Sequence, residues 1–186
     1  MQVAFYGGSF NPPHVAHVLA VVYLLSAQGF QRVLVVPVFE HAFEKPLAGF
    51  EHRVRMCELA MGWLPGVQVS AVEAELERPT RTLHTLEHLS RQHPDWALRL
   101  VVGADQLPEL HRWHQVDAIE AMAPILVLGR ASVDRPEAPP ALLPNVSSTH
   151  VRELLLSRGQ AEADSELGRL VPQNVLRYID QHGLYR

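Results

Sequence analysis

The stretch Gly7-Gly8-Ser9-Phe10-Asn11-Pro12-Pro13-His14-Val15-Ala16-His17 lies between an apolar run, Val3–Tyr6, and a second apolar run, Val18–Leu25. This order predicts a strand, a glycine-rich turn and a helix. A glycine pair lets the backbone approach a ligand closely, and a helix start offers unpaired N–H groups that suit phosphate. His14 and His17 are three residues apart, so they share one face of the first helical turn. The stretch therefore predicts a site that handles a phosphoryl group.

Apolar runs with the character of buried parallel strands recur along the chain, at Val3–Tyr6, Val33–Val38, Val67–Val72, Leu98–Val102 and Ile125–Leu128. Helical patterns alternate with them, at Val15–Gln28, Phe50–Leu64, Thr82–Gln92, Ala104–Leu110, Val116–Met122, Val151–Ser157 and Gln173–His182. This alternation predicts an α/β fold with a Rossmann-like, doubly wound parallel sheet and right-handed crossovers. Ligands of such sheets bind at the carboxyl ends of the strands, where the glycine-rich stretch falls.

Composition limits the class of protein. A chain of 186 residues with 47% hydrophobic content is most simply one globular domain, so we expect residues 1–186 to form a single unit. The net charge of −4 argues against a dedicated nucleic-acid binder. No basic-then-apolar leader opens the chain and no apolar run reaches about 18 residues, so we expect a cytoplasmic protein without membrane contact. Whether the protein is a monomer or a homo-oligomer is left open.

Two separated motifs resemble signatures of the nucleotidylyltransferase superfamily. The first stretch is similar to the pattern G-G-[ST]-F-[DN]-P-x-H-x-G-H, and Asn145-Val146-Ser147-Ser148-Thr149-His150-Val151-Arg152 is similar to the pattern S-[ST]-[ST]-x-x-R. The pair in this order is more specific than either motif alone. One position departs, because Ala16 stands where the family has glycine, and its methyl group could crowd a phosphate. The resemblance implies the nucleotidylyltransferase type of doubly wound sheet.

The resemblance also implies adenylyl transfer, in which a phosphate oxygen of a mononucleotide attacks the α-phosphate of ATP. That oxygen is already ionised, so the reaction needs positioning and charge stabilisation rather than a general base. We expect His14, His17 and Arg152 to be catalytic. The expected ATP-binding residues are Gly7, Gly8, Ser9, Phe10, His17, Gly103, Asp105, Ser148, Thr149 and Arg152, with Asp105 accepting from the ribose hydroxyls. Mg²⁺ would arrive on the ATP phosphates, so we expect no metal-ligand set in the protein.

Further positions resemble the bacterial nicotinate mononucleotide adenylyltransferases. The tail Tyr178–Tyr185 is similar to theirs, and Trp113 stands where the enzymes that make dinucleotides carry a Trp that stacks on the pyridine ring. Their pattern S-Y-T-x-D-T-L matches here at Thr82, Thr85 and Leu86, whereas Arg81 and His84 replace Tyr and Asp. The expected acceptor-binding residues are Lys45, Thr82, Thr85, Trp113 and Arg130.

Each feature alone also has a purely structural explanation. The Ser147–Thr149 run could serve as a helix cap and nothing more, Trp113 could belong to the core, and Lys45 could be a solvated loop lysine. Of Arg53 and Arg55, we expect at least one on the surface. The joint pattern outweighs these explanations, because both phosphate motifs, the histidine pair and Arg152 are all present.

The sequence therefore predicts an enzyme that transfers the adenylyl group of ATP to nicotinate mononucleotide, giving the deamido-NAD dinucleotide and pyrophosphate. Four alternatives stay open. They are, in decreasing order, a nicotinamide mononucleotide or dual-specificity enzyme, a pantetheine-phosphate adenylyltransferase, a cytidylyltransferase and a non-catalytic nucleotide-binding module.

Overall fold

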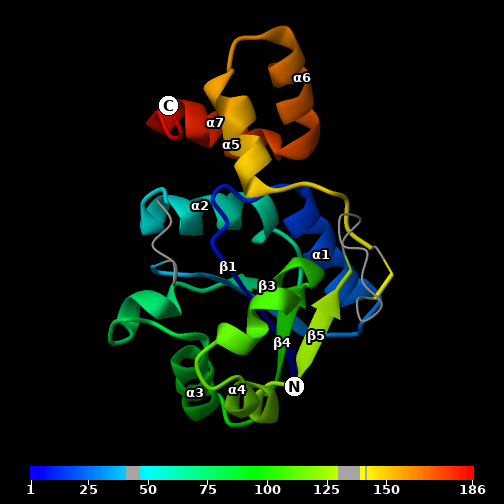
Figure 1. Cartoon of the computed structure of the whole chain (residues 1–186), viewed down its shortest axis with the longest axis vertical. Helices are drawn as coiled ribbons and strands as arrows, with labels where there is room; N and C mark the ends of the chain where they lie inside the picture. The colour runs from blue at the N-terminus through cyan, green and yellow to red at the C-terminus, as the bar shows by residue number, and fades with distance from the viewer. Residues whose placement is uncertain (41–46, 130–138, 141) are drawn as a thin grey trace.

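The computed structural model describes residues 1–40, 47–129, 139–140 and 142–186. Its centre is a sheet of parallel strands in the order β3-β2-β1-β4-β5 (Figure 1). The strands are β1 (Gln2–Gly8), β2 (Arg32–Pro37), β3 (Val67–Val69), β4 (Ala97–Gly103) and β5 (Ile125–Leu128). The expected doubly wound parallel sheet is confirmed, and the strand order reverses direction between β1 and β4.

Helices cover both faces of this sheet. One face packs against α1 (Val15–Ser26) and α2 (Phe50–Met61), with α5 (Ser148–Leu156), α6 (Ala161–Leu170) and α7 (Gln173–His182) joining the same core. The other face packs against α3 (Thr82–Gln92) and α4 (Val116–Met122). Two 3₁₀ helices, η1 (Val72–Glu75) and η2 (Ala104–Arg112), follow β3 and β4.

The two cores follow from the alternation of side chains along the strands. In β1, Ala4 faces the core beneath α1 and α2, whereas Val3 and Phe5 face the core beneath α3 and α4. Successive strand residues point to opposite faces, so a strand covered on both sides must be apolar throughout. This explains the unbroken apolar runs in the sequence.

Several boundaries differ from the expected ones. The strand expected over Val67–Val72 ends at Val69, and Ala104–Leu110 belongs to a 3₁₀ helix that runs to Arg112. Helix α6 (Ala161–Leu170) was not predicted. Its only large apolar side chains are Leu167 and Leu170, and Gly168 lies between them, so the run has few of the residues that favour a helix with a large apolar face.

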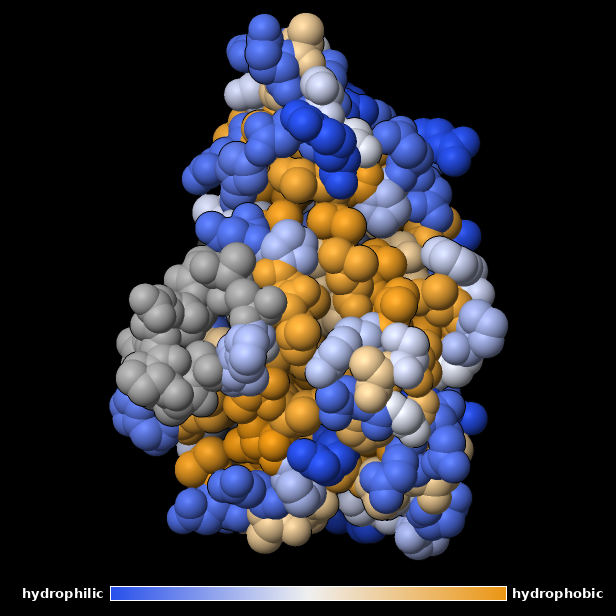
Figure 2. Space-filling view, turned by 90° about the vertical axis from the view of Figure 1, so that its right-hand side faces the viewer, coloured by the Kyte–Doolittle hydropathy of each residue, from blue (hydrophilic) through white to orange (hydrophobic). Residues whose placement is uncertain are grey.

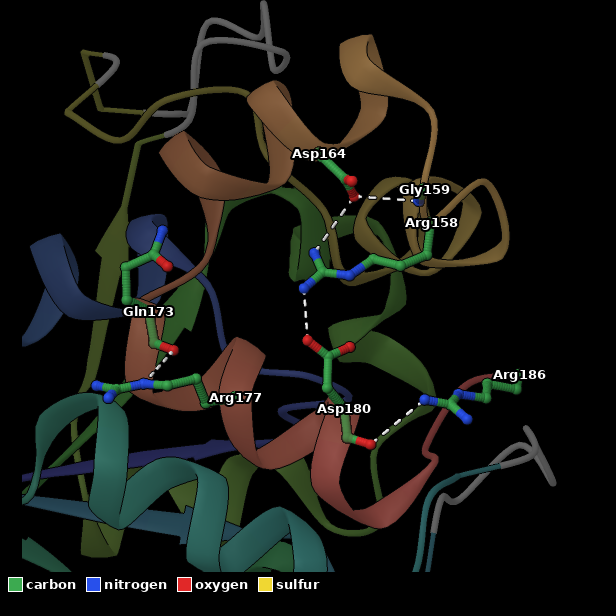
Figure 3. A network of polar contacts seen from close by, with 7 residues as sticks. All are labelled: Arg158, Gly159, Asp164, Gln173, Arg177, Asp180 and Arg186. Carbon is green, nitrogen blue, oxygen red and sulfur yellow. Dashed lines mark hydrogen bonds and ion pairs between the residues drawn. The ribbon is translucent and has the colours of Figure 1, made fainter.

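The three carboxyl-terminal helices are joined by polar contacts around one arginine (Figure 3). Arg158, which follows α5, donates to Asp180 of α7 at 2.5 Å and lies 3.5 Å from Asp164 of α6. Helix α7 ends at Gly183 in the left-handed conformation (φ 61°), as its position after the helical pattern predicts. These contacts fix the tail, which reaches the site described below.

Helix α1 is apolar on more than its buried side. Leu19 and Val22 on this helix are 43% and 39% exposed. Figure 2 shows the side of the molecule that carries α1 and β5, where apolar atoms gather. Even so, none of the helices in the described ranges is long and apolar enough to cross a bilayer.

Candidate active site

The candidate site lies where β1 and β4 separate. Their pairing runs from Gln2 and Ala97 to Phe5 and Leu100, and each strand then continues for three more residues. This is the point at which the strand order reverses, and ligands of open α/β sheets bind there. The glycine-rich stretch follows β1, and Gly103 and Asp105 stand at the end of β4 and the start of η2.

The loop from β1 to α1 turns sharply at Phe10, which has a positive φ of 44° and precedes a cis bond between Asn11 and Pro12. The Phe10 ring is 1% exposed and packs in the core. Contact between Phe10 and ATP would therefore run through its backbone. A methyl group added at Gly8 would lie 3.3 Å from the Phe10 ring, so glycine lets the loop pack closely here.

The two motif histidines differ in exposure. His14 is the N-cap of α1 and is 1% exposed, whereas His17 keeps partial exposure. Their ring centroids are 3.8 Å apart, and the Phe10 ring meets His17 edge-on at 4.9 Å. His17 is thus the histidine of the pair that a ligand can reach, and His14 and Phe10 support its ring.

A hydrogen bond fixes the tautomer of His17. Its Nδ1 accepts the backbone N–H of His14 at 3.1 Å. A neutral imidazole that accepts at Nδ1 carries its proton on Nε2. His17 can therefore offer an Nε2–H donor without being protonated, which suits a phosphate oxygen.

The substitution of the family glycine by Ala16 does not crowd this loop. Ala16 is 1% exposed and belongs to the core cluster of α1 and α2. Its methyl group packs inside the protein rather than into the open side of the loop.

The second motif meets the first. Ser147 caps α5 by accepting the backbone N–H of His150 at 3.2 Å, so the helix begins at Ser148 rather than at the expected Val151. Ser148 Oγ donates to the carbonyl of Pro12 at 2.9 Å, and Arg152 Nη1 donates to the carbonyl of Asn11 at 2.7 Å. Residues about 140 positions apart in the sequence thus form one unit.

Arg152 is only partly occupied by these contacts. Its Nη2 donates to Thr149 Oγ1 at 3.2 Å, within the same motif. A guanidinium carries five N–H donors in a fixed fork, so donors remain for a ligand phosphate. Arg152 can therefore both hold the loop and bind an anion.

The expected acceptor side lies at the start of α3. Helix α3 begins at Thr82, and the N–H groups of its first turn have no acceptor within the helix. The ring centroids of His84 and His114 are 6.0 Å apart, so this helix start lies beside the segment after η2. Trp113, in that segment, is partly buried against the core beneath α3 and α4. The structure thus brings Thr82 and Trp113 to neighbouring elements.

The expected acceptor set also includes Thr85, Lys45 and Arg130. Thr85 is fully buried and its hydroxyl donates to Glu73 at 3.2 Å, so it acts inside the protein rather than at an open surface. Lys45 and Arg130 lie outside the described residues.

Cys57, the one cysteine of the sequence, is buried in the core. Burial raises the pKa of the Cys57 thiol well above its usual range, so this buried cysteine stays protonated. Within the described ranges, no cluster of three or more His, Cys, Asp or Glu could hold a metal ion.

Comparison with known proteins identifies the family of this chain. The cytidylyltransferase-like family model matches residues 5–154. A curated protein of Anaeromyxobacter dehalogenans, named "Probable nicotinate-nucleotide adenylyltransferase", is 46% identical over the whole chain and 97% of its own length. A protein of the same name from Myxococcus xanthus is 39% identical over the whole chain and 95% of its own length. The chain belongs to the nicotinate-nucleotide adenylyltransferase family.

A solved structure has the same fold as this chain. The nicotinic acid mononucleotide adenylyltransferase of Plasmodium falciparum superposes with a TM-score of 0.83 and 18% identity, covering 99% of this chain and 97% of that one. At this identity the likeness shows the fold alone.

Several buried polar residues beside the site of this adenylyltransferase were not predicted from the sequence. Arg53 is 1% exposed and donates to four backbone carbonyls, of Ser9, Val38, Phe39 and Ala48. The feature of the sequence that could have indicated its burial is its helical spacing from Met56, Cys57 and Ala60, which are all buried on the same face of α2. Arg55, on the surface, pairs with Glu58.

The tail also contributes a missed residue. Tyr185 donates its hydroxyl to Asn11 Oδ1 at 2.8 Å, and the same oxygen accepts the backbone N–H of Ala48 at 3.0 Å. Burial raises the pKa of Tyr185, so its hydroxyl remains a donor. The tail thus orients the asparagine of the first motif.

Proposed function

We propose that this chain transfers the adenylyl group of ATP to nicotinate mononucleotide, giving the deamido-NAD dinucleotide and pyrophosphate. The observation that carries the proposal is the meeting of the two phosphate motifs at the point where β1 and β4 separate, with His17 of α1 and Arg152 of α5 both hydrogen-bonded to the loop between β1 and α1. The names of the relatives support the pyridine acceptor. A protein of this fold from Plasmodium falciparum is described as complexed with NaAD.

The reaction is a displacement at the α-phosphorus of ATP. An ionised phosphate oxygen of the acceptor forms a new bond to that phosphorus, and the bond to the β-bridging oxygen breaks, releasing pyrophosphate. His17 donates its Nε2–H to a non-bridging α-oxygen, where charge builds up. No proton must be removed from the nucleophile, so the reaction needs no general base.

The remaining residues position the two substrates. Arg152 offers its further N–H donors to the phosphates, and Asp105, exposed at the start of η2, accepts from the adenosine ribose. Mg²⁺ would arrive bound to the ATP phosphates and would neutralise the charge of the leaving pyrophosphate. The N–H groups at the start of α3 face the pyridine carboxylate.

One assay tests the proposal. MgATP is mixed with nicotinate mononucleotide, nicotinamide mononucleotide or phosphopantetheine, and pyrophosphate release is measured for each. We expect rapid release with nicotinate mononucleotide. Release with phosphopantetheine alone would favour the pantetheine-phosphate enzyme, and no release with any acceptor would favour a binding module.

We expect nicotinate mononucleotide to be preferred over nicotinamide mononucleotide by at least about tenfold in kcat/KM. A carboxylate accepts charge-assisted hydrogen bonds from the N–H groups around Thr82. An amide presents its own NH₂ to those donors and leaves some unpaired, which costs about 1–3 kcal/mol each. The measurement is kcat/KM for both acceptors at saturating MgATP. Equal values would mean dual specificity.

Trp113 should report acceptor binding by fluorescence. We expect nicotinate mononucleotide to quench part of the tryptophan emission by stacking on its ring, and Trp113→Phe to remove that quench. Trp63 and Trp96 serve as controls, because they precede β3 and β4 and so lie toward the amino ends of the strands. Trp63→Phe and Trp96→Phe should keep the quench. An unchanged quench in Trp113→Phe would exclude stacking.

A further inference from the structure

Two buried groups of opposite charge bind the same peptide unit beside the site. Arg53 is 1% exposed and Glu73 is 5% exposed. Arg53 Nη1 donates to the carbonyl of Val38 at 2.7 Å, and the N–H of the same peptide unit, on Phe39, donates to Glu73 Oε2 at 2.8 Å. Buried charges of this kind persist only where they are paired and hydrogen-bonded, and these two meet across a backbone group at the end of β2.

Arg53 also reaches two other segments. Its Nε donates to the carbonyl of Ala48 at 2.9 Å, and its Nη1 donates to the carbonyl of Ser9 at 3.1 Å. Phe39 and Ala48 stand on either side of residues 41–46, which include Lys45, and Ser9 belongs to the phosphate loop. One side chain therefore fixes the phosphate loop together with both flanks of that segment.

Beyond Phe39, Glu73 contacts residues just before and within α3. Its carboxylate accepts the hydroxyl of Thr80 at 3.3 Å and that of Thr85 at 3.2 Å. Thr85 lies in α3, whose first turn is the expected binding site for the pyridine carboxylate. Glu73 thus joins the end of β2 to the start of α3, and among the residues that the structure describes its hydrogen bonds go to Phe39, Thr80 and Thr85 and not to the phosphate loop.

We propose that Arg53 and Glu73 are positioning residues, with Glu73 setting the acceptor half of the site alone and Arg53 setting both the acceptor half and the phosphate loop. The inference rests on the proposed function for the identity of the acceptor. The difference between the two residues follows from their contacts, because only Arg53 binds Ser9. It predicts that the two substrates respond differently to the two substitutions.

The test compares matched variants at each position. Glu73→Leu removes the carboxylate that accepts from the Phe39 N–H and from the two threonine hydroxyls. Glu73→Gln keeps one oxygen for Phe39 and offers an amide that donates to Thr85, whose hydroxyl can turn to the carbonyl of Arg81 at 3.3 Å. Arg53→Met keeps a long unbranched side chain but removes all five donors. Arg55→Met, two residues along α2 and exposed, is the control.

We expect Glu73→Leu to raise KM for nicotinate mononucleotide by about tenfold or more while KM for ATP changes by less than about twofold. Glu73→Gln should restore most of the loss. Arg53→Met should raise both KM values, and Arg55→Met neither. Calorimetric titration of each substrate alone should give the same split between acceptor and ATP without turnover, which a general loss of stability would not produce.

Two outcomes would overturn the inference: equal changes of both KM values in Glu73→Leu, or no change in either. If Glu73→Leu does not fold, Thr85→Val and Thr85→Ser decide in the same way, because Val removes the hydroxyl at equal shape and Ser retains it. A wild-type protein that does not turn over nicotinate mononucleotide would refute the proposed function. An active wild type with no split would refute the present inference alone.

Discussion

His17→Ala should lower kcat by about 10²–10³-fold, while KM for ATP changes far less. The reason is that the Nε2–H of His17 is aimed at charge that develops on the α-phosphate only in the transition state. The hydrogen bond from the backbone N–H of His14 to Nδ1 fixes that tautomer in the free protein. Steady-state kinetics at varied MgATP and saturating acceptor measures the effect.

Matched variants separate the donor from the fold. His17→Gln places an amide N–H near the position of Nε2, so it should retain more activity than His17→Ala. His182→Ala changes an exposed histidine on α7 and should leave kcat unchanged. A folded His17→Ala protein that turns over at nearly the wild-type rate would show that His17 has another role.

Arg152→Lys should lower kcat/KM for ATP by about 10- to 100-fold, with the KM of the acceptor little changed. The guanidinium donates to the Asn11 carbonyl at 2.7 Å and to Thr149 at 3.2 Å while keeping donors for phosphate. An ammonium group is a single point of charge and cannot make these bonds together. Kinetics with each substrate varied in turn checks this.

The control for Arg152 is another arginine on the same group of helices. Arg169→Lys changes an exposed residue of α6 and should have no kinetic effect. Equal loss of ATP and acceptor use in Arg152→Lys would point to a role in folding, since Arg152 also holds the first motif through Asn11.

The fold and the two phosphate motifs are predictable because their signals are local. A buried parallel strand must be apolar on both faces, and a strand–glycine–helix order fixes where the loop falls. Helix α6 was not predicted because its large apolar side chains are only Leu167 and Leu170, with Gly168, a poor helix former, between them. Its position depends on tertiary contacts, such as that of Asp164 with Arg158.

The buried polar residues behind the site escape prediction for a different reason. The partners of Arg53 are backbone carbonyls on two loops, and every residue type carries a backbone carbonyl, so the sequence does not reveal these contacts. Glu73 and Tyr185 likewise depend on segments far away in the chain. The exposure of the two motif histidines could not be predicted either, because both occupy equivalent places in the motif, although His14 is buried and His17 is partly exposed.

The most direct test of the central claim follows the phosphorus atoms of ATP. The protein is incubated with Mg²⁺, nicotinate mononucleotide and ATP labelled either at the α- or at the γ-phosphorus, and the products are separated. Attack at the α-phosphorus predicts that the α-label appears in the deamido-NAD dinucleotide and the γ-label in pyrophosphate, in equal amounts. A γ-label in the acceptor product, or pyrophosphate without any dinucleotide, would contradict the account.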